Sequence, residues 1–477
     1  MNFLTHKRTY YFFIFLLCVV SRLFTSIYYI EDIDSLRFAL SIQDYDLAKI
    51  QPHFPGYPVF CFLVKVFYFF TGSLAQSFSL IGGISVFMII LYTNKIFSTK
   101  LNSSLGFFIS LIIFFNPMIW LMSNRYMPDL FGFALACLIL CSFIRYDNSK
   151  TSIYSAFFFS GLMLGVRLSY FPIIFLVLLG TIFNKKFQFL WLVSYFLLGI
   201  AIWLIPLIAI TGFDDLIVIA KNHTLGHFYD YGGSIITDND FNQRILRIVE
   251  SIGADGFGGY WPGRSVKTLL ISFIMGMLSI IGIREMIKNI KFERSLLIIL
   301  MCSLIYLIWI FISQNVIYKS RHILPILLFV FLILSYGYEY LLIKNRSFAK
   351  IVVSVFAFFL IQVTFKLTQQ HAMPTAISQV KEHVKNKGNF HSIISTPLVN
   401  FYLKTHMIDL EFFDATNEED IERFVINNSD STALIIGDFQ QLFKDQFVIK
   451  EDSVFYHNPY VNRAWSSIDT YLLVGKK

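Results

Sequence analysis

Apolar runs of about 20 residues recur along the chain from residue 9 to residue 367, and short polar connectors separate them. A helix needs about 20 apolar residues to cross the hydrocarbon core of a membrane. The number of runs excludes a secreted soluble domain behind a single signal peptide. The pattern predicts eleven spans, near residues 9–30, 76–94, 105–122, 127–144, 152–167, 170–183, 188–210, 267–283, 295–313, 323–343 and 350–367.

The charge of the connectors predicts the orientation of these spans. Lysine and arginine are retained on the cytoplasmic side of membranes, so basic connectors are expected to lie there. All basic connectors fall on one side if Tyr57–Thr71 lies in the outer leaflet without crossing, whereas a crossing there would reverse the connectors that follow. We favour the first arrangement. It places the first loop (31–75), a long loop (211–266) and the C-terminal tail on the extracytoplasmic side.

The tail changes character after residue 368. The segments HSIIST, TALIIGD and DTYLLVGKK have the short apolar pattern of buried strands, and NEEDIERFVI has helical periodicity. Residues 369–477 are therefore expected to form a small extracytoplasmic α/β domain. The glycine cluster at 253–263 lacks a preceding strand and the third glycine of a dinucleotide site, so we interpret it as a flexible lid or loop.

Composition supports an all-α polytopic membrane protein with this added domain. Of 477 residues, 56% are hydrophobic and only 15% are charged. The net charge of +8 reflects topology in such a protein, and no nucleic-acid partner is predicted. All five cysteines lie inside apolar segments, so neither disulfides nor a cysteine zinc site is expected.

The first loop carries the most distinctive polar residues. Asp32 and Asp34 follow the first span by about one turn, and a partly desolvated carboxylate there suits a general base, although outer loops also tolerate acids without a function. The sequence PHFPGYP fixes the backbone at three prolines and frees it at Gly56. His53 and Tyr57 in this element are candidate substrate contacts, with an interfacial role as the alternative for His53.

Ionised residues also occur at the outer ends of spans. Such groups are costly near hydrocarbon unless they are paired or line a wet cavity, which makes them functional candidates, although arginine can also reach the headgroups by snorkelling. Arg125 and Asp129 occupy one connector, and Asp129 is a candidate substrate contact. Arg167 follows two small residues, Gly161 and Gly165, which favours close helix packing and an inward-facing arginine.

Two further cations lie on the side that the positive-inside bias disfavours. Lys319 and Arg321 in YKSRHILP would be explained by a phosphate at headgroup level, which binds basic groups through charge-assisted hydrogen bonds. Headgroup binding without catalysis is the alternative. His223 and His227 have a spacing that could hold a metal on a helix, but Gly226 is expected to weaken that helix, so we favour acceptor or lid contacts.

Together these motifs resemble the GT-C superfamily of integral-membrane glycosyltransferases over about residues 10–345. The similarity is to the protein O-mannosyltransferase-like and lipid A aminoarabinose transferase-like branches, and to a bacterial group whose first loop carries Asp-x-x-Glu-Phe and then HPPGxP. The matching features are the acidic first-loop motif, the HxPGYP element, a GxxxGxRxS helix with a proline behind it, a basic pair before a late span and a small outer tail.

The resemblance implies transfer of a sugar from a polyprenyl-phosphate or polyprenyl-diphosphate carrier to a glycan, lipid or protein acceptor outside the cell membrane. Matching DSLRF to the motif implies that Asp34 is the base; Arg37 stands where the group has Glu, and Asp32 could replace that carboxylate. The resemblance also implies that basic groups at span ends bind the donor phosphate, here Arg125, Arg167, Lys319 and Arg321. A single displacement predicts inversion at the anomeric carbon.

Two other classes remain open from the sequence. A transporter or flippase of lipid-linked sugars would use the same cations, but the spans after residue 188 contain almost no ionisable residues. A non-catalytic subunit of a polysaccharide assembly complex is the third interpretation. No cofactor is predicted, and no residue pattern supports a divalent metal.

Overall fold

The computed structural model describes residues 2–145, 150–290, 293–386, 390–406, 408–427, 432–457, 463 and 466–475, with residues 2–8 described by their backbone. The chain forms two compact units. The helical unit contains Met1–Ile27 and Arg37–Ala372, and the C-terminal unit contains Tyr28–Leu36 and Met373–Lys477. A short segment of the first loop therefore belongs to the same unit as the tail.

Each of the eleven predicted spans contains helical structure. Among the described residues, seven helical stretches are long and apolar enough to cross a membrane, one of which is Lys150–Ile182, where two of the predicted spans lie in one stretch. The bent pair α5 and α6 brings the number to eight if it is counted as one span. The helices that correspond to the predicted spans are α1 (Asn2–Phe24), α4 (Leu74–Ile96), α5 (Ser104–Phe114) with α6 (Pro117–Asn124), α7 (Asp129–Ile144), α8 (Lys150–Arg167), α9 (Phe171–Ile182), α10 (Phe189–Thr211), α13 (Thr268–Asn289), α14 (Arg294–Ser313), α15 (Leu327–Lys344) and α16 (Arg346–His371). The chain is a polytopic membrane protein, as the hydropathy pattern predicted.

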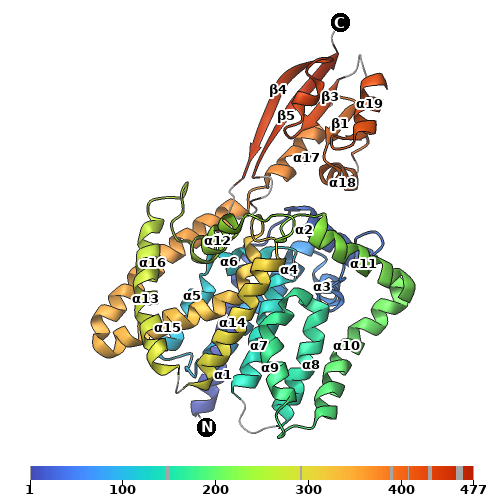
Figure 1. Cartoon of the computed structure of the whole chain (residues 1–477). Helices are drawn as coiled ribbons and strands as arrows, with labels where there is room; N and C mark the ends of the chain where they lie inside the picture. Colours follow the sequence, from blue (N-terminus) through green and yellow to red (C-terminus); the bar gives the residue numbers. More distant parts are fainter. Residues whose placement is uncertain are drawn as a thin grey trace. The chain divides into compact units, whose positions relative to one another are not determined.

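Polar residues at the helix starts explain several of these boundaries. The side chains of Ser103, Asn116 and Asn345 accept hydrogen bonds from backbone amides three residues later, at 3.0 Å in each case. These N-caps satisfy amides that have no partner inside the helix. Figure 1 shows α7, α8, α9 and α14 side by side in the helical unit.

The break between α5 and α6 is stabilised from two other helices. The pair bends by 52° at Phe115 and Asn116, which frees carbonyl groups that would be costly inside a membrane. Thr364 of α16 donates to the carbonyl of Phe115 at 2.6 Å. Arg22 of α1, which is fully buried, donates to the carbonyl of Phe114 at 2.7 Å. The buried Arg22 therefore has a structural explanation.

The predicted first loop is largely helical. It contains α2 (Ile33–Gln43) and α3 (Pro58–Thr71). With 14 residues, α3 is about 21 Å long, which is less than the roughly 30 Å of a bilayer core. This length agrees with a segment that does not cross, although its position in a membrane remains a prediction.

The predicted long loop at 211–266 is also mostly helical. It contains α11 (Phe213–Tyr229), α12 (Phe241–Glu250) and a π-helical turn η2 (Ser251–Gly256). Helix α11 continues through Gly226, where a Cβ would meet the ring of Tyr231 at 2.4 Å, so glycine serves packing here rather than ending the helix. The glycine cluster begins within the largely buried η2 turn and ends in non-helical residues, of which 260, 262 and 263 are exposed.

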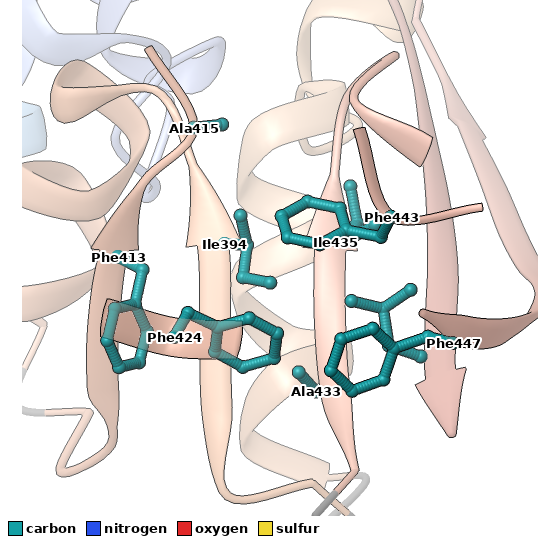
Figure 2. Packing of buried hydrophobic residues seen from close by; sticks show 9 residues of the cluster. Ile394, Phe413, Ala415, Phe424, Ala433, Ile435, Phe443 and Phe447 are labelled. Carbon is teal, nitrogen blue, oxygen red and sulfur yellow. The ribbon is translucent and has the colours of Figure 1, made fainter. Parts of the chain in front are cut away.

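The C-terminal unit is built on a five-stranded sheet with the order β2-β1-β3-β5-β4. Strands β2, β1 and β3 are parallel, and β5 and β4 add antiparallel neighbours. Figure 2 shows its core, in which Phe424 packs among Phe413, Phe443 and Phe447. The elements are α17 (Ala376–Asn386), β1 (Ser392–Ser395), α18 (Pro397–Thr405), β2 (Glu411–Asp414), α19 (Glu418–Asn427), β3 (Ala433–Ile436), η4 (Gln440–Phe443), β4 (Phe447–Tyr456) and β5 (Ser467–Gly475).

Candidate functional site

Arg167 lies where helix α8 ends. Its backbone is extended (φ −154°, ψ 90°), and a single 3-10 turn, η1 (Leu168–Tyr170), connects it to α9. A Cβ on Gly161 would meet the Phe196 carbonyl oxygen at 2.2 Å, and a Cβ on Gly165 would meet Trp203 at 2.7 Å. The two glycines therefore let α8 and α10 approach closely, as the sequence predicted.

Asp129 binds two arginines at the first turn of α7. Its Oδ1 lies 3.0 Å from a terminal nitrogen of Arg167 and 3.7 Å from Nε of Arg321. The Asp129 side chain is 1% exposed and each arginine side chain is 9% exposed. The pairs lower the cost of burying three charges. The two arginines therefore share this carboxylate.

Gly132 makes room for this cluster. It lies one turn after Asp129 on α7, and a Cβ there would meet Cβ of Arg167 at 2.8 Å and the ring of Tyr170 at 3.1 Å. Sequence analysis missed Gly132. The signal that could have found it is a small residue three positions after a buried acid on the same helix face.

The proline-rich element of the first loop contacts the same arginine. Arg167 donates to the Tyr57 hydroxyl oxygen at 3.1 Å, and that hydroxyl lies 2.9 Å from Nε2 of His53. A guanidinium can only donate, so the Tyr57 hydrogen is available for His53 Nε2, and a neutral His53 carries its proton on Nδ1. The loop is fixed by a hydrogen bond from the Tyr45 hydroxyl to the Gly56 carbonyl at 2.8 Å.

Helix α11 adds both predicted histidines to this region. The rings of His223 and His53 stack with centroids 5.4 Å apart. His227 Nε2 lies 2.9 Å from the Ser313 carbonyl oxygen, so Nε2 is the donor. Burial lowers the pKa of His227; the bond to Ser313 raises it, and the charges of Lys319 and Arg167 lower it. His227 therefore lies in the field of the same cations.

The 3-10 turn η3 (Ser320–Ile326) carries Arg321 into the cluster. The hydroxyl of Tyr306 donates to the carbonyl of His322 at 2.9 Å, and its ring contacts Tyr170 edge to face at 5.7 Å. The two tyrosines were not predicted, because aromatic residues inside apolar spans give no signal that separates them from core residues. The structure brings together Tyr57, His53, Asp129, Arg167, Arg321 and both histidines of α11, with the charge of Lys319 nearby.

The remaining predicted residues are Arg125 in the helical unit and Asp32 and Asp34 in the C-terminal unit. Arg125 is buried at the end of α6, four residues before Asp129. In the C-terminal unit, the Asp32 side chain accepts the Ser35 amide at 2.8 Å and caps helix α2. Asp34 occupies the second position of that helix. The capping contact gives Asp32 a structural role that the sequence interpretation did not include.

The structure offers little for a metal. Within the described ranges, no group of three or more histidine, cysteine, aspartate or glutamate side chains is close enough to hold an ion. The five cysteines are all buried and unbonded to one another. The described side chains that surround Asp129 and Arg167 are those of arginine, tyrosine and histidine.

Comparison with known proteins identifies the fold. No protein-family model and no curated protein matches the sequence. The structure is nevertheless similar over its whole length to solved structures. Two of these are crystal structures of ArnT from Cupriavidus metallidurans.

The ArnT structure bound to undecaprenyl phosphate has a TM-score of 0.57 at 12% sequence identity, and the match covers 99% of this chain and 100% of that chain. The apo ArnT structure has a TM-score of 0.53 at 11% identity, with 99% of each chain covered. At these identities the likeness establishes the fold.

Proposed function

We propose that this chain is a membrane glycosyltransferase that moves a sugar from a polyprenyl-phosphate carrier to an extracytoplasmic acceptor. The observation that carries the proposal is the buried cluster of Arg167, Asp129 and Arg321, in a fold shared with a protein that binds undecaprenyl phosphate. Guanidinium groups suit phosphate oxygens, because they donate two parallel charge-assisted hydrogen bonds.

Arg167 has a donor group available for a phosphate ligand. Among the described residues, Nε of Arg167 is buried and has no hydrogen-bond partner. A buried unsatisfied donor costs free energy, and a phosphate oxygen would satisfy it. Arg321 and the charge of Lys319 would contribute to the same anion, and Tyr57 and His53 would orient the sugar side of the donor.

The proposed reaction is a single displacement with inversion. The acceptor oxygen bonds to the anomeric carbon while the bond from that carbon to the phosphate oxygen breaks, and the phosphate leaves with the electron pair. Asp34 takes the acceptor proton as general base. Arg167 and Arg321 stabilise the negative charge that grows on the leaving phosphate. The assignment of Asp34 rests on the match of DSLRF to the acidic motif of the GT-C group.

The test is transfer of labelled sugar from a panel of polyprenyl-phosphate donors to envelope acceptors. Membranes would carry the native chain, Asp34→Asn, or the control Asp44→Asn, which removes a carboxylate whose side chain is 60% exposed. We expect Asp34→Asn to lower the rate by about 10² to 10⁴-fold while undecaprenyl phosphate binding is retained. Equal product from all three chains would remove Asp34 from the chemistry, and movement of lipid-linked sugar without a covalent product would favour a transporter.

A further inference from the structure

The acidic segment after the first span is joined to the far end of the chain. Residues Tyr28–Leu36 form one compact unit with Met373–Lys477. The carbonyl of Glu31 accepts a hydrogen bond from Thr375, 344 positions later. Asp32 and Asp34 directly follow this contact. The residues that bind the segment therefore affect the position of Asp34, the proposed base.

Three buried hydroxyl groups make the attachment. Thr375 donates to the Glu31 carbonyl at 2.9 Å, and Ser378 donates to the Ile30 carbonyl at 2.5 Å. The Tyr402 hydroxyl lies 3.4 Å from the same Ile30 oxygen. All three side chains are at most 2% exposed. The Glu31 carbonyl contact is buried and the Ile30 contacts are partly buried. These hydrogen bonds hold the segment in one register, since losing a donor leaves a shielded carbonyl unsatisfied.

Helix α17, which carries Ser378 and follows Thr375, is hydrogen-bonded to the region of strand β4. The Ala376 amide at the start of α17 donates to Nδ1 of His457 at 2.9 Å, and the Gln379 side chain donates to the Tyr456 carbonyl at 3.1 Å. His383 of the same helix contacts Asp452 of β4 at 2.7 Å. These bonds attach α17 to the sheet. The contacts of Thr375 and Ser378 therefore fix the position of the acidic segment relative to the sheet.

Tyr402 keeps its proton under physiological conditions. Burial raises its pKa to about 12; the hydrogen bond with Ser378 lowers the pKa, while the charge of Asp32 raises it. The hydroxyl therefore remains a donor beside the segment. Asp32 in turn caps α2 through Ser35, which fixes the turn on which Asp34 lies.

We infer that the C-terminal unit is a positioning element for the acidic segment, in which Thr375, Ser378 and Tyr402 fix the backbone that carries Asp34. The inference rests on the proposed function only for the role of Asp34. It assigns the tail domain a part in the transfer step, because a base must be held within hydrogen-bond reach of the proton it removes.

The experiment compares the full-length chain with two double variants in lipid nanodiscs. Thr375→Val with Ser378→Ala removes the two short contacts. Ser395→Ala with Thr416→Val is the control, because these hydroxyls donate to the Ile436 carbonyl and to the Asp414 side chain, which belong neither to the acidic segment nor to α17. Amide hydrogen exchange of the peptide 28–36 is measured in each chain, together with kcat and donor KM for sugar transfer.

We expect the first double variant to exchange the peptide 28–36 about tenfold faster and to lose kcat by a similar factor, with donor KM unchanged. The control should resemble the native chain, and Thr375→Ser, which keeps the hydroxyl, should behave as native. Unchanged exchange in the first double variant overturns the attachment. Faster exchange with unchanged kcat overturns the positioning role. A native chain that transfers no sugar removes the proposed function, whereas the exchange measurement still decides the attachment.

Discussion

At the residue scale, the main feature is the carboxylate of Asp129, which contacts two arginines. Asp129 is 1% exposed and lies within 4 Å of Arg167 and Arg321. Removal of one partner from a buried ion pair costs about 3–5 kcal/mol, because the remaining charge is left uncompensated. The Asp129 carboxylate therefore lowers the cost of burying the two arginines.

His227 makes the stability of this region depend on pH. Its pKa lies below the ordinary value of 6.5, because of burial and despite the hydrogen bond to Ser313, with the charges of Lys319 and Arg167 lowering it further. The unfolded chain therefore binds a proton more readily than the folded one, and stability falls as pH drops below about 6.5. We expect the thermal unfolding midpoint of the native chain to be lower at pH 5.5 than at pH 7.5.

His227→Gln should reduce that fall, since glutamine does not titrate. The measurement is the thermal unfolding midpoint at both pH values, and His391→Gln is the control because His391 is exposed. An equal drop in the native chain and in His227→Gln would contradict the argument.

At the element scale, the position of Arg167 depends on how closely two helices approach. A Cβ on Gly161 would meet the Phe196 carbonyl oxygen at 2.2 Å, and a Cβ on Gly199 would meet the Phe158 carbonyl oxygen at the same distance. These glycines permit backbone contact between α8 and α10. Arg167 ends α8, so a change in this packing moves the arginine that contacts Asp129.

Gly161→Ala is expected to lower both stability and function. Overpacking of this kind costs about 1–3 kcal/mol, and we expect a lower thermal midpoint with weaker binding of undecaprenyl phosphate. Gly180→Ala on α9 is the matched control, because a Cβ at Gly180 meets nothing within 4 Å. Alanine in an open helix position is expected to be neutral or slightly stabilising. Equal midpoints for the two variants would show that the α8–α10 contact adapts without cost.

At the scale of the whole molecule, the open question is which side each connector faces. The basic connectors predict a cytoplasmic position for the α9–α10 turn and an outer position for the first loop and the C-terminal unit. The native cysteines are all buried. They give a low background for labelling experiments, which allows the orientation to be tested directly.

We expect Asp44→Cys and Thr416→Cys to react with a membrane-impermeant maleimide in intact cells. Lys186→Cys should react only after the membrane is permeabilised. All three positions are exposed, so burial does not decide the outcome. Labelling of Lys186→Cys in intact cells would reverse the predicted orientation.

The helices of the membrane part could be predicted because long apolar runs have few alternatives. The helices α2 and α11 were missed because their sequences mix charged and aromatic residues, and such segments resemble loops. Strand β4 was missed because FVIKEDSVFY carries charges at its centre. Among site residues, the ionised ones were found by their cost near hydrocarbon, whereas Gly132 and Tyr306 act through space and packing that no single sequence reveals.

The contact between Glu31 and Thr375 also has a consequence for biosynthesis. A ribosome adds roughly 5–20 residues per second, so the 344 positions that separate these residues take on the order of 20 to 70 seconds to make. During that interval the acidic segment has emerged without the hydroxyl groups that fix it. Nascent chains that end before residue 375 thus lack this native attachment.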